Sequence, residues 1–197
     1  MNRSNSVIAF LLLSLPSAAS AHLVNSGLGP FYDGVLHLLL SPADVLGLLA
    51  VTLLAGLRGP KAGRWTVIVL PIAWFAAGLI GLHAGAGIEL PWAGVLSLLV
   101  LGGLVAADVN LPPGAVAFLA ALFAAFQGLS NGEALAALGA GTVSLLGIAG
   151  SACVIALLIS AAVVALRLAW ARIAVRVAGS WVAAVGLLMF GWLSQTA

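Results

Sequence analysis

The sequence predicts an all-α integral membrane protein, a bundle of six transmembrane helices that follows an N-terminal signal peptide. Its 197 residues are 63% hydrophobic and only 6% charged, and the mean hydropathy is +1.25. A soluble chain of this size needs roughly a quarter of its residues charged to cover its surface. The seven Lys and Arg residues lie in short segments beside apolar runs. They therefore indicate topology, and they exclude a basic surface for nucleic acid.

The first 21 residues have the parts of a secretory signal peptide. Arg3 gives a short positive region, residues 7–15 form an apolar core, and Ala19-Ser20-Ala21 is a small-x-small cleavage site. This core is too short to cross about 30 Å of hydrocarbon as a helix. We expect cleavage after Ala21, so that His22 begins a mature membrane domain of residues 22–197. An uncut segment would remain as an anchor and leave the topology unchanged.

Six apolar stretches follow, separated by Gly, Pro or charged residues. We place them at 35–57, 65–83, 92–107, 113–129, 139–166 and 173–193. If the mature chain starts outside, every basic segment, including the loop expected at 58–64, faces the cytoplasm, as the positive-inside rule requires. The protein is therefore predicted to cross the bacterial inner membrane several times, with both ends of the mature chain in the periplasm.

The first span carries the most informative polar residues. Ionisable side chains in hydrocarbon cost several kcal/mol unless they are paired or hydrated, so each is a functional candidate. His37 and Asp44 are seven residues apart, on one face of a helix and about 10 Å from each other. Pro42 can kink the helix beside the acid, and Asp33 would extend the pair into a ladder toward the outer surface. Alternatively, Asp33 is a helix cap, His37 is interfacial, and Asp44 bonds to a neighbouring helix.

Other polar candidates lie near the outer ends of the predicted spans. His83 ends the second span, where it is either a metal ligand or a solvated side chain. The fourth span emerges near Gln127 and is followed by Asn131 and Glu133, and the glycine after Asn131 favours a plain outer turn. Imidazole and carboxylate together suit nickel, cobalt, copper or zinc. A mature N-terminal His22 could also hold one ion through its α-amine and ring nitrogen.

Several segments resemble the motifs of a known family. Residues 34–45 are similar to Gly-x-x-His-Pro-x-x-Gly-x-Asp-His, but one extra residue separates His37 from Asp44, and Val45 replaces the second histidine. Residues 126–133 are similar to Phe-His-Gly-x-x-His-Gly-x-Glu, with amides at both histidine positions. Further similarities are the start Ala21-His22, the pattern Pro71, Phe75, Gly78 and Gly81, the stretch 97–102, and the beginning of the last span at 176–179.

On these motifs the chain resembles the HupE/UreJ family of small membrane proteins, regarded as nickel or cobalt permeases that accompany hydrogenases and ureases. His37 and Asp44 match ligand positions of the family motif. We therefore expect metal capture at the periplasmic face, with His37 as first ligand and Asp44 as intramembrane acceptor. The vestibule would be completed by Gln127, Asn131 and Glu133. The ion would be captured outside by two histidines, His22 and His83. Amides are weak ligands for nickel or cobalt. Either this branch handles a different or harder cation, or it keeps the scaffold without transport.

Two functions stay open from the sequence alone. The first is a permease or metal-binding protein whose substrate is a divalent transition metal such as nickel, cobalt or copper. The second is a non-transporting structural or accessory subunit of a membrane complex. The sequence has no phosphate-binding loop, dinucleotide fingerprint or Ser-His-Asp set, so we expect no enzyme. The expected partners are the lipid bilayer, a metal ion, and a membrane protein or a second copy of the chain.

Overall fold

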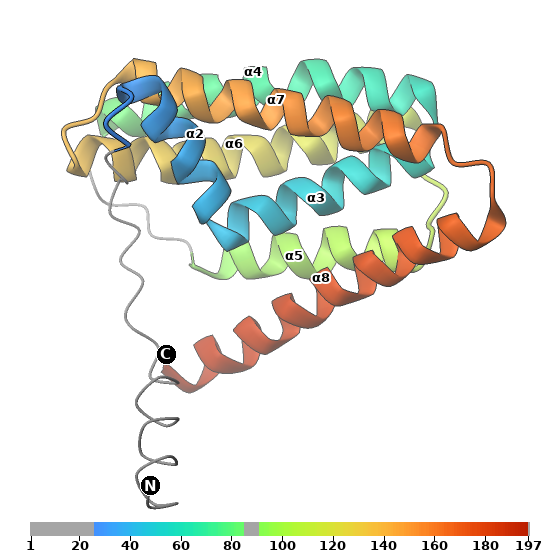
Figure 1. Ribbon diagram of the computed structural model, residues 1–197. Helices are drawn as coiled ribbons and strands as arrows, with labels where there is room; N and C mark the ends of the chain where they lie inside the picture. The colour runs from blue at the N-terminus through green and yellow to red at the C-terminus, as the bar shows by residue number, and fades with distance from the viewer. Residues whose placement is uncertain (1–25, 85–90, 197) are drawn as a thin grey trace, which may run out of the picture.

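The computed structural model describes residues 26–84 and 91–196, which fold into seven α-helices without a strand (Figure 1). The helices are α2 (Pro30–Leu40), α3 (Pro42–Leu57), α4 (Pro60–Ala84), α5 (Pro91–Ala106), α6 (Pro113–Ala137), α7 (Thr142–Val164) and α8 (Ala169–Thr196). The all-α prediction is confirmed for this part of the chain. The predicted signal peptide, its cleavage site and His22 lie outside the described residues.

Four helices are long and apolar enough to cross a membrane, namely α4, α6, α7 and α8. The pair α2 and α3 would be a fifth span if both helices are taken together, and α5 is apolar but has only 16 residues. The chain is therefore a multi-pass membrane protein. The count of six spans stays a prediction.

The first predicted span is not one helix but two. α2 ends at Leu40, α3 begins at Pro42, and the chain bends by 77° between them. Pro42 disfavours helical backbone at the preceding residue, and Ser41 is extended with φ −93° and ψ 97°. The Ser41 hydroxyl donates to the His37 carbonyl at 2.7 Å, which satisfies one of the orphan acceptors at the end of α2. The prediction that His37 and Asp44 share one face of a continuous helix is wrong.

Two segments predicted as loops are helical. α4 begins at Pro60, so Lys61 and Arg64 lie on its first turns. α6 continues to Ala137, so the outer turn expected near Asn131 is wrong. The turn signal of the glycine at position 132 is overridden because that glycine lies in a helix contact, where a side chain would not fit.

Glycines allow α4 and α6 to lie side by side (Figure 1). A Cβ atom on Gly128 would collide with the Trp74 carbonyl, and one on Gly132 would collide with the Gly78 carbonyl. Both contacts advance by one turn in the same direction, so the two helices run parallel here. Small residues let helix backbones approach closely in membrane proteins, where packing replaces the hydrophobic effect as the main attraction between helices.

α3 occupies the middle of the bundle and contacts each of the other helices, and α5 packs mainly with α8 along one flank (Figure 1). Ten of the α3 residues between Gly47 and Leu57 are buried. The described Lys and Arg residues lie near the α3–α4 and α7–α8 connections, at what we call the basic end. The opposite end, where α2 begins and His83 lies on the last turn of α4, is called the histidine end.

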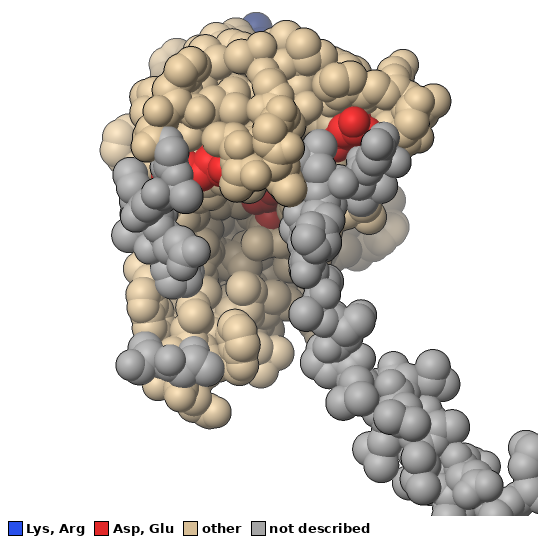
Figure 2. Space-filling view, turned by 90° about the vertical axis from the view of Figure 1, so that its left-hand side faces the viewer, with Lys and Arg blue, Asp and Glu red and all other residues tan. Residues whose placement is uncertain are grey.

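An ion pair holds the basic end together. The Arg58 guanidinium pairs with Asp108, and its other amino group donates to Asn110 Oδ1 at 3.3 Å. Arg172 lies 3.8 Å from the second Asp108 oxygen. Figure 2 views the histidine end, where Asp and Glu atoms are visible and Lys or Arg atoms are nearly absent among the described residues. Among the described residues, Lys and Arg are thus confined to the basic end, where Asp108 is paired with them.

Candidate functional site

Four buried polar side chains meet beside the break between α2 and α3. They are His37 from the last turn of α2, Asp44 from the first turn of α3, and Gln127 and Asn131 from α6. Each is between 5% and 7% exposed. We call these four residues the polar cluster.

The amide of Asn131 links the two ionisable groups. Its Oδ1 lies 3.0 Å from His37 Nε2, and its Nδ2 donates to Asp44 Oδ2 at 3.2 Å. Gln127 Nε2 donates to the other Asp44 oxygen. Both carboxylate oxygens therefore have amide donors, as a buried acid requires. The alternative in which Asp44 bonds to a neighbouring helix describes this contact.

This network sets the hydrogen positions on the His37 ring. Because the nitrogen of Asn131 donates to Asp44, its oxygen is the group that faces His37. An oxygen acceptor requires a hydrogen on Nε2, so a neutral His37 ring has its lone pair on Nδ1. A cation that binds His37 without breaking the network would therefore use Nδ1.

The four-residue spacing along α6 explains how this helix contacts α4 with one face and the α2–α3 break with the adjacent face. Gln127 and Asn131 are four residues apart and share a face that contacts the break between α2 and α3. Gly128 and Gly132 have the same spacing on the adjacent face, which lies against α4. Residues 126–133 therefore contribute two glycines to the contact with α4 and two amides to the polar cluster.

A model of the HupE / UreJ protein family matches residues 10–189, most of the chain. The chain belongs to the HupE/UreJ family. The resemblance inferred from the sequence is confirmed, and it places the protein among membrane proteins known for metal transport or accessory roles. Searches of curated proteins and of solved structures gave no match.

Three other residues expected at the site of this HupE/UreJ protein do not belong to the polar cluster. Asp33 Oδ1 accepts hydrogen bonds from the backbone N and the hydroxyl of Ser26, at 2.7 and 2.6 Å. His83 is exposed at the end of α4, and its Nδ1 lies 2.7 Å from the Leu79 carbonyl oxygen. Glu133 is partly buried, and its Oε1 has no hydrogen-bond partner among the described residues.

The cluster holds fewer strong metal donors than a closed protein site. Among the described residues, no group of three or more His, Cys, Asp and Glu side chains is placed to hold a metal ion. His37 and Asp44 supply one imidazole and one carboxylate, and the two family histidine positions supply amides. Amide oxygens suit harder cations than imidazole does.

Sequence reasoning missed two aromatic side chains next to the cluster. Phe123 lies one turn before Gln127 on α6, and its ring packs edge to face on Trp74 with 5.7 Å between centroids. Both rings are almost fully buried. A signal was present, because Phe123 is four residues from Gln127 and eight from Asn131, which places it on the same helix face.

Proposed function

We propose that this protein is an inner-membrane permease or metal-binding protein for a divalent transition metal, captured at the periplasmic face. Membership of the HupE/UreJ family supports a role in metal transport. The observation that carries the proposal is the polar cluster, an imidazole and a carboxylate buried together within the helix bundle. Ionisable residues are rare inside membrane proteins and usually mark a path for an ion or substrate.

The charge distribution supports the proposed direction of entry. Basic residues flanking membrane helices favour the cytoplasmic side, so the histidine end would face the periplasm. Exposed His83 and the acidic atoms visible in Figure 2 would attract a cation there. His22, after signal cleavage, would add a further capture group. His37 would then be the first committed ligand and Asp44 the intramembrane acceptor.

The amides define how selective this path would be. Gln127 and Asn131 hold Asp44 in place through their NH₂ groups, and each also has a carbonyl oxygen. If either amide turned over, an oxygen would replace a donor beside an incoming cation. By family membership the substrate would be nickel or cobalt, and the single imidazole would lower affinity relative to a site with several histidines.

A specific observation favours a second function, that of a non-transporting accessory subunit in a membrane complex. Asp44 and His37 already have partners within the chain, so the cluster can stabilise the helix packing with no ion. In that case the four residues would hold α2, α3 and α6 together. A stoichiometric membrane partner would then co-purify with the protein.

Cellular metal content separates the two functions. Cells expressing wild type, His37→Ala or no protein would be given nickel, cobalt, copper and zinc at low concentration and analysed by mass spectrometry at matched expression. Accumulation of one metal with wild type but not with His37→Ala supports the permease and names its substrate. Equal content in all three strains for every metal supports the accessory role.

A gain-of-function variant sharpens this experiment. Gln127→His with Asn131→His restores both histidines of the family motif at positions that already face His37 and Asp44. We expect it to raise accumulation of nickel or cobalt because imidazole binds these ions more strongly than an amide. His83→Ala is the matched control for loss of a histidine outside the cluster, and it should reduce uptake less than His37→Ala.

A further inference from the structure

The polar cluster ends abruptly toward the basic end, at Phe123. α3 and α6 run antiparallel here, so one turn beyond the Asp44–Gln127 contact lies the contact between Gly47 and Phe123. A Cβ atom on Gly47 would lie only 2.6 Å from Phe123 Cζ, so the ring tip rests directly on the α3 backbone. No side chain other than glycine's hydrogen leaves room for the ring in this position.

Trp74 holds the Phe123 ring from the α4 side. The two rings are perpendicular within 3°, with an interplanar angle of 87°. Trp74 is fully buried, and its indole Nε1 has no hydrogen-bond partner among the described residues. An unpaired buried donor destabilises the arrangement that contains it. The observed position of the ring pair therefore leaves this donor unpaired within the described part of the chain.

Beyond the rings the interior is apolar for more than one turn. Leu48, Val51, Leu54 and Ala120 are fully buried there. Buried polar side chains reappear on this side at Thr52, Thr66 and Ser160. The Ser160 hydroxyl donates to the Thr52 carbonyl at 3.3 Å. A hydrated cation at the polar cluster cannot enter this region, because transfer of an ion into an apolar interior is strongly unfavourable. The cluster is thus separated from the basic end.

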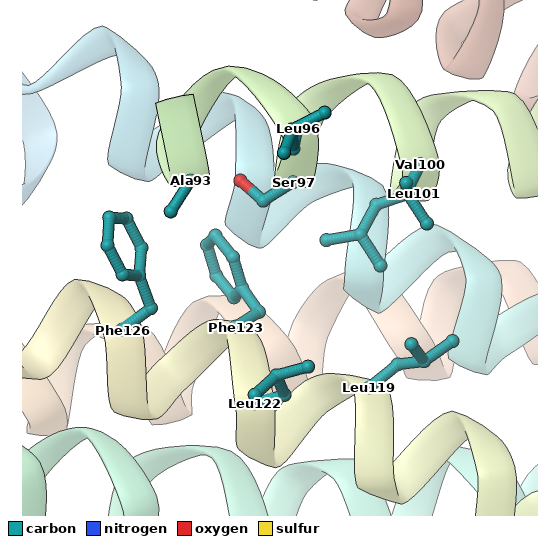
Figure 3. Close-up of a pocket in the computed structure, with 9 residues that line it drawn as sticks. All are labelled: Ala93, Leu96, Ser97, Val100, Leu101, Leu119, Leu122, Phe123 and Phe126. Atoms are coloured by element: carbon teal, nitrogen blue, oxygen red, sulfur yellow. The ribbon is translucent and has the colours of Figure 1, made fainter. Parts of the chain in front are cut away.

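A cavity lies beside the Phe123 ring, between α5 and α6 (Figure 3). The cavity is open on one side, where Leu96, Val100 and Leu122 are exposed on the surface of the bundle. Its volume is about 320 Å³, and its lining is almost entirely apolar. Figure 3 shows the ring standing between the two helices, with Ser97 and Leu101 opposite it on α5. An apolar cavity of about 150 Å³ accommodates a benzene molecule. The space beside Phe123 is therefore larger than a phenyl ring needs.

We propose that Phe123 is the gate of the ion path: its ring closes the polar cluster against Gly47 and opens it by rotating into the α5–α6 cavity. This inference rests on the proposed function, since a gate needs a path. Trp74 is a positioning residue that supports the closed ring. Side-chain rotation of a buried ring needs no movement of the helix axes, so the bundle stays intact while the path opens and closes.

Accessibility of a single thiol beyond the ring tests the gate. The native thiol is removed with Cys153→Ala, and Thr52→Cys places a reporter on the basic side of Phe123. Silver ion, a small thiol-reactive cation, is added in nitrate buffer to spheroplasts whose outer surface is exposed. Thiols left unreacted are then labelled with a fluorescent maleimide after denaturation, which gives the rate of silver entry.

With Phe123→Ala we expect silver to react about tenfold faster than with the native ring, equivalent to a barrier lower by about 1.4 kcal/mol. Phe126→Ala is the matched control, because it removes an equal ring from the same cavity but not from the Gly47 contact. It should leave the rate unchanged. Ser97→Phe fills the cavity and should slow the reaction. Phe123→Leu, which keeps apolar volume, should give an intermediate rate if the alanine variant does not fold.

Equal rates with Phe123, Phe123→Leu and Phe123→Ala would overturn the gate, and so would equal acceleration by Phe126→Ala. This measurement does not depend on metal uptake. Ring-dependent silver entry without accumulation of any metal would keep the gate and remove the proposed transport. Metal accumulation together with a silver reaction rate that does not depend on Phe123 would support the proposed transport and overturn the gate.

Discussion

Replacing Asn131 with alanine tests whether the polar cluster holds three helices together. Asn131 makes one hydrogen bond to His37 on α2 and one to Asp44 on α3. Hydrogen bonds between membrane helices contribute about 0.6 kcal/mol on average and about 1.7 kcal/mol at most. Loss of both therefore lowers the free energy of unfolding by about 1–3 kcal/mol, and the partner groups are left buried.

The assay is reversible unfolding in mixed micelles of dodecylmaltoside and SDS, followed by circular dichroism. Ser130→Ala is the control, because Ser130 is adjacent on α6 but takes no part in the network. We expect it to change the unfolding free energy by less than about 0.5 kcal/mol, as substitutions away from key contacts usually do. If Asn131→Ala cost no more than this control, the bridging role would be refuted. A double-mutant cycle with Gln127→Ala would then show whether the two amides act independently.

Two further substitutions probe the packing and the ion pair. Gly132→Ala should lower the free energy of unfolding by about 1–3 kcal/mol, because the added methyl group overpacks against α4. Gly103→Ala, with open space around it, should be neutral or stabilising by up to about 1 kcal/mol. Similar effects of both substitutions on the SDS unfolding midpoint would contradict this packing. Asp108→Asn keeps a residue that tolerates the local φ of 52° but removes the charge facing nearly buried Arg58. It should lower the unfolding free energy by about 1–2 kcal/mol. An unchanged thermal unfolding midpoint in detergent would show that the Arg58–Asp108 ion pair does not stabilise the protein.

The polar candidates were accessible from the sequence because a membrane makes them conspicuous. His37 and Asp44 are ionisable residues in apolar surroundings, and Gln127 and Asn131 stand at the histidine positions of a family motif. Each is recognisable without knowing its neighbours. Their partners were not, since Asn131 lies 94 residues from His37 and 87 from Asp44 along the chain. The predicted straight helix through Pro42 also concealed how the two ionisable groups share one amide.

By itself the sequence determined the membrane class, the family and the segregation of basic residues, because each depends on how a local segment interacts with lipid or water. Only the tertiary structure decided that α2 and α3 are separate, that Gly128 and Gly132 are packing residues, and that the Phe123 ring lies against Gly47. These features depend on which helices approach each other and at what register. That choice is made by side-chain volume and hydrogen-bond geometry between distant segments, which hydropathy along one chain does not encode.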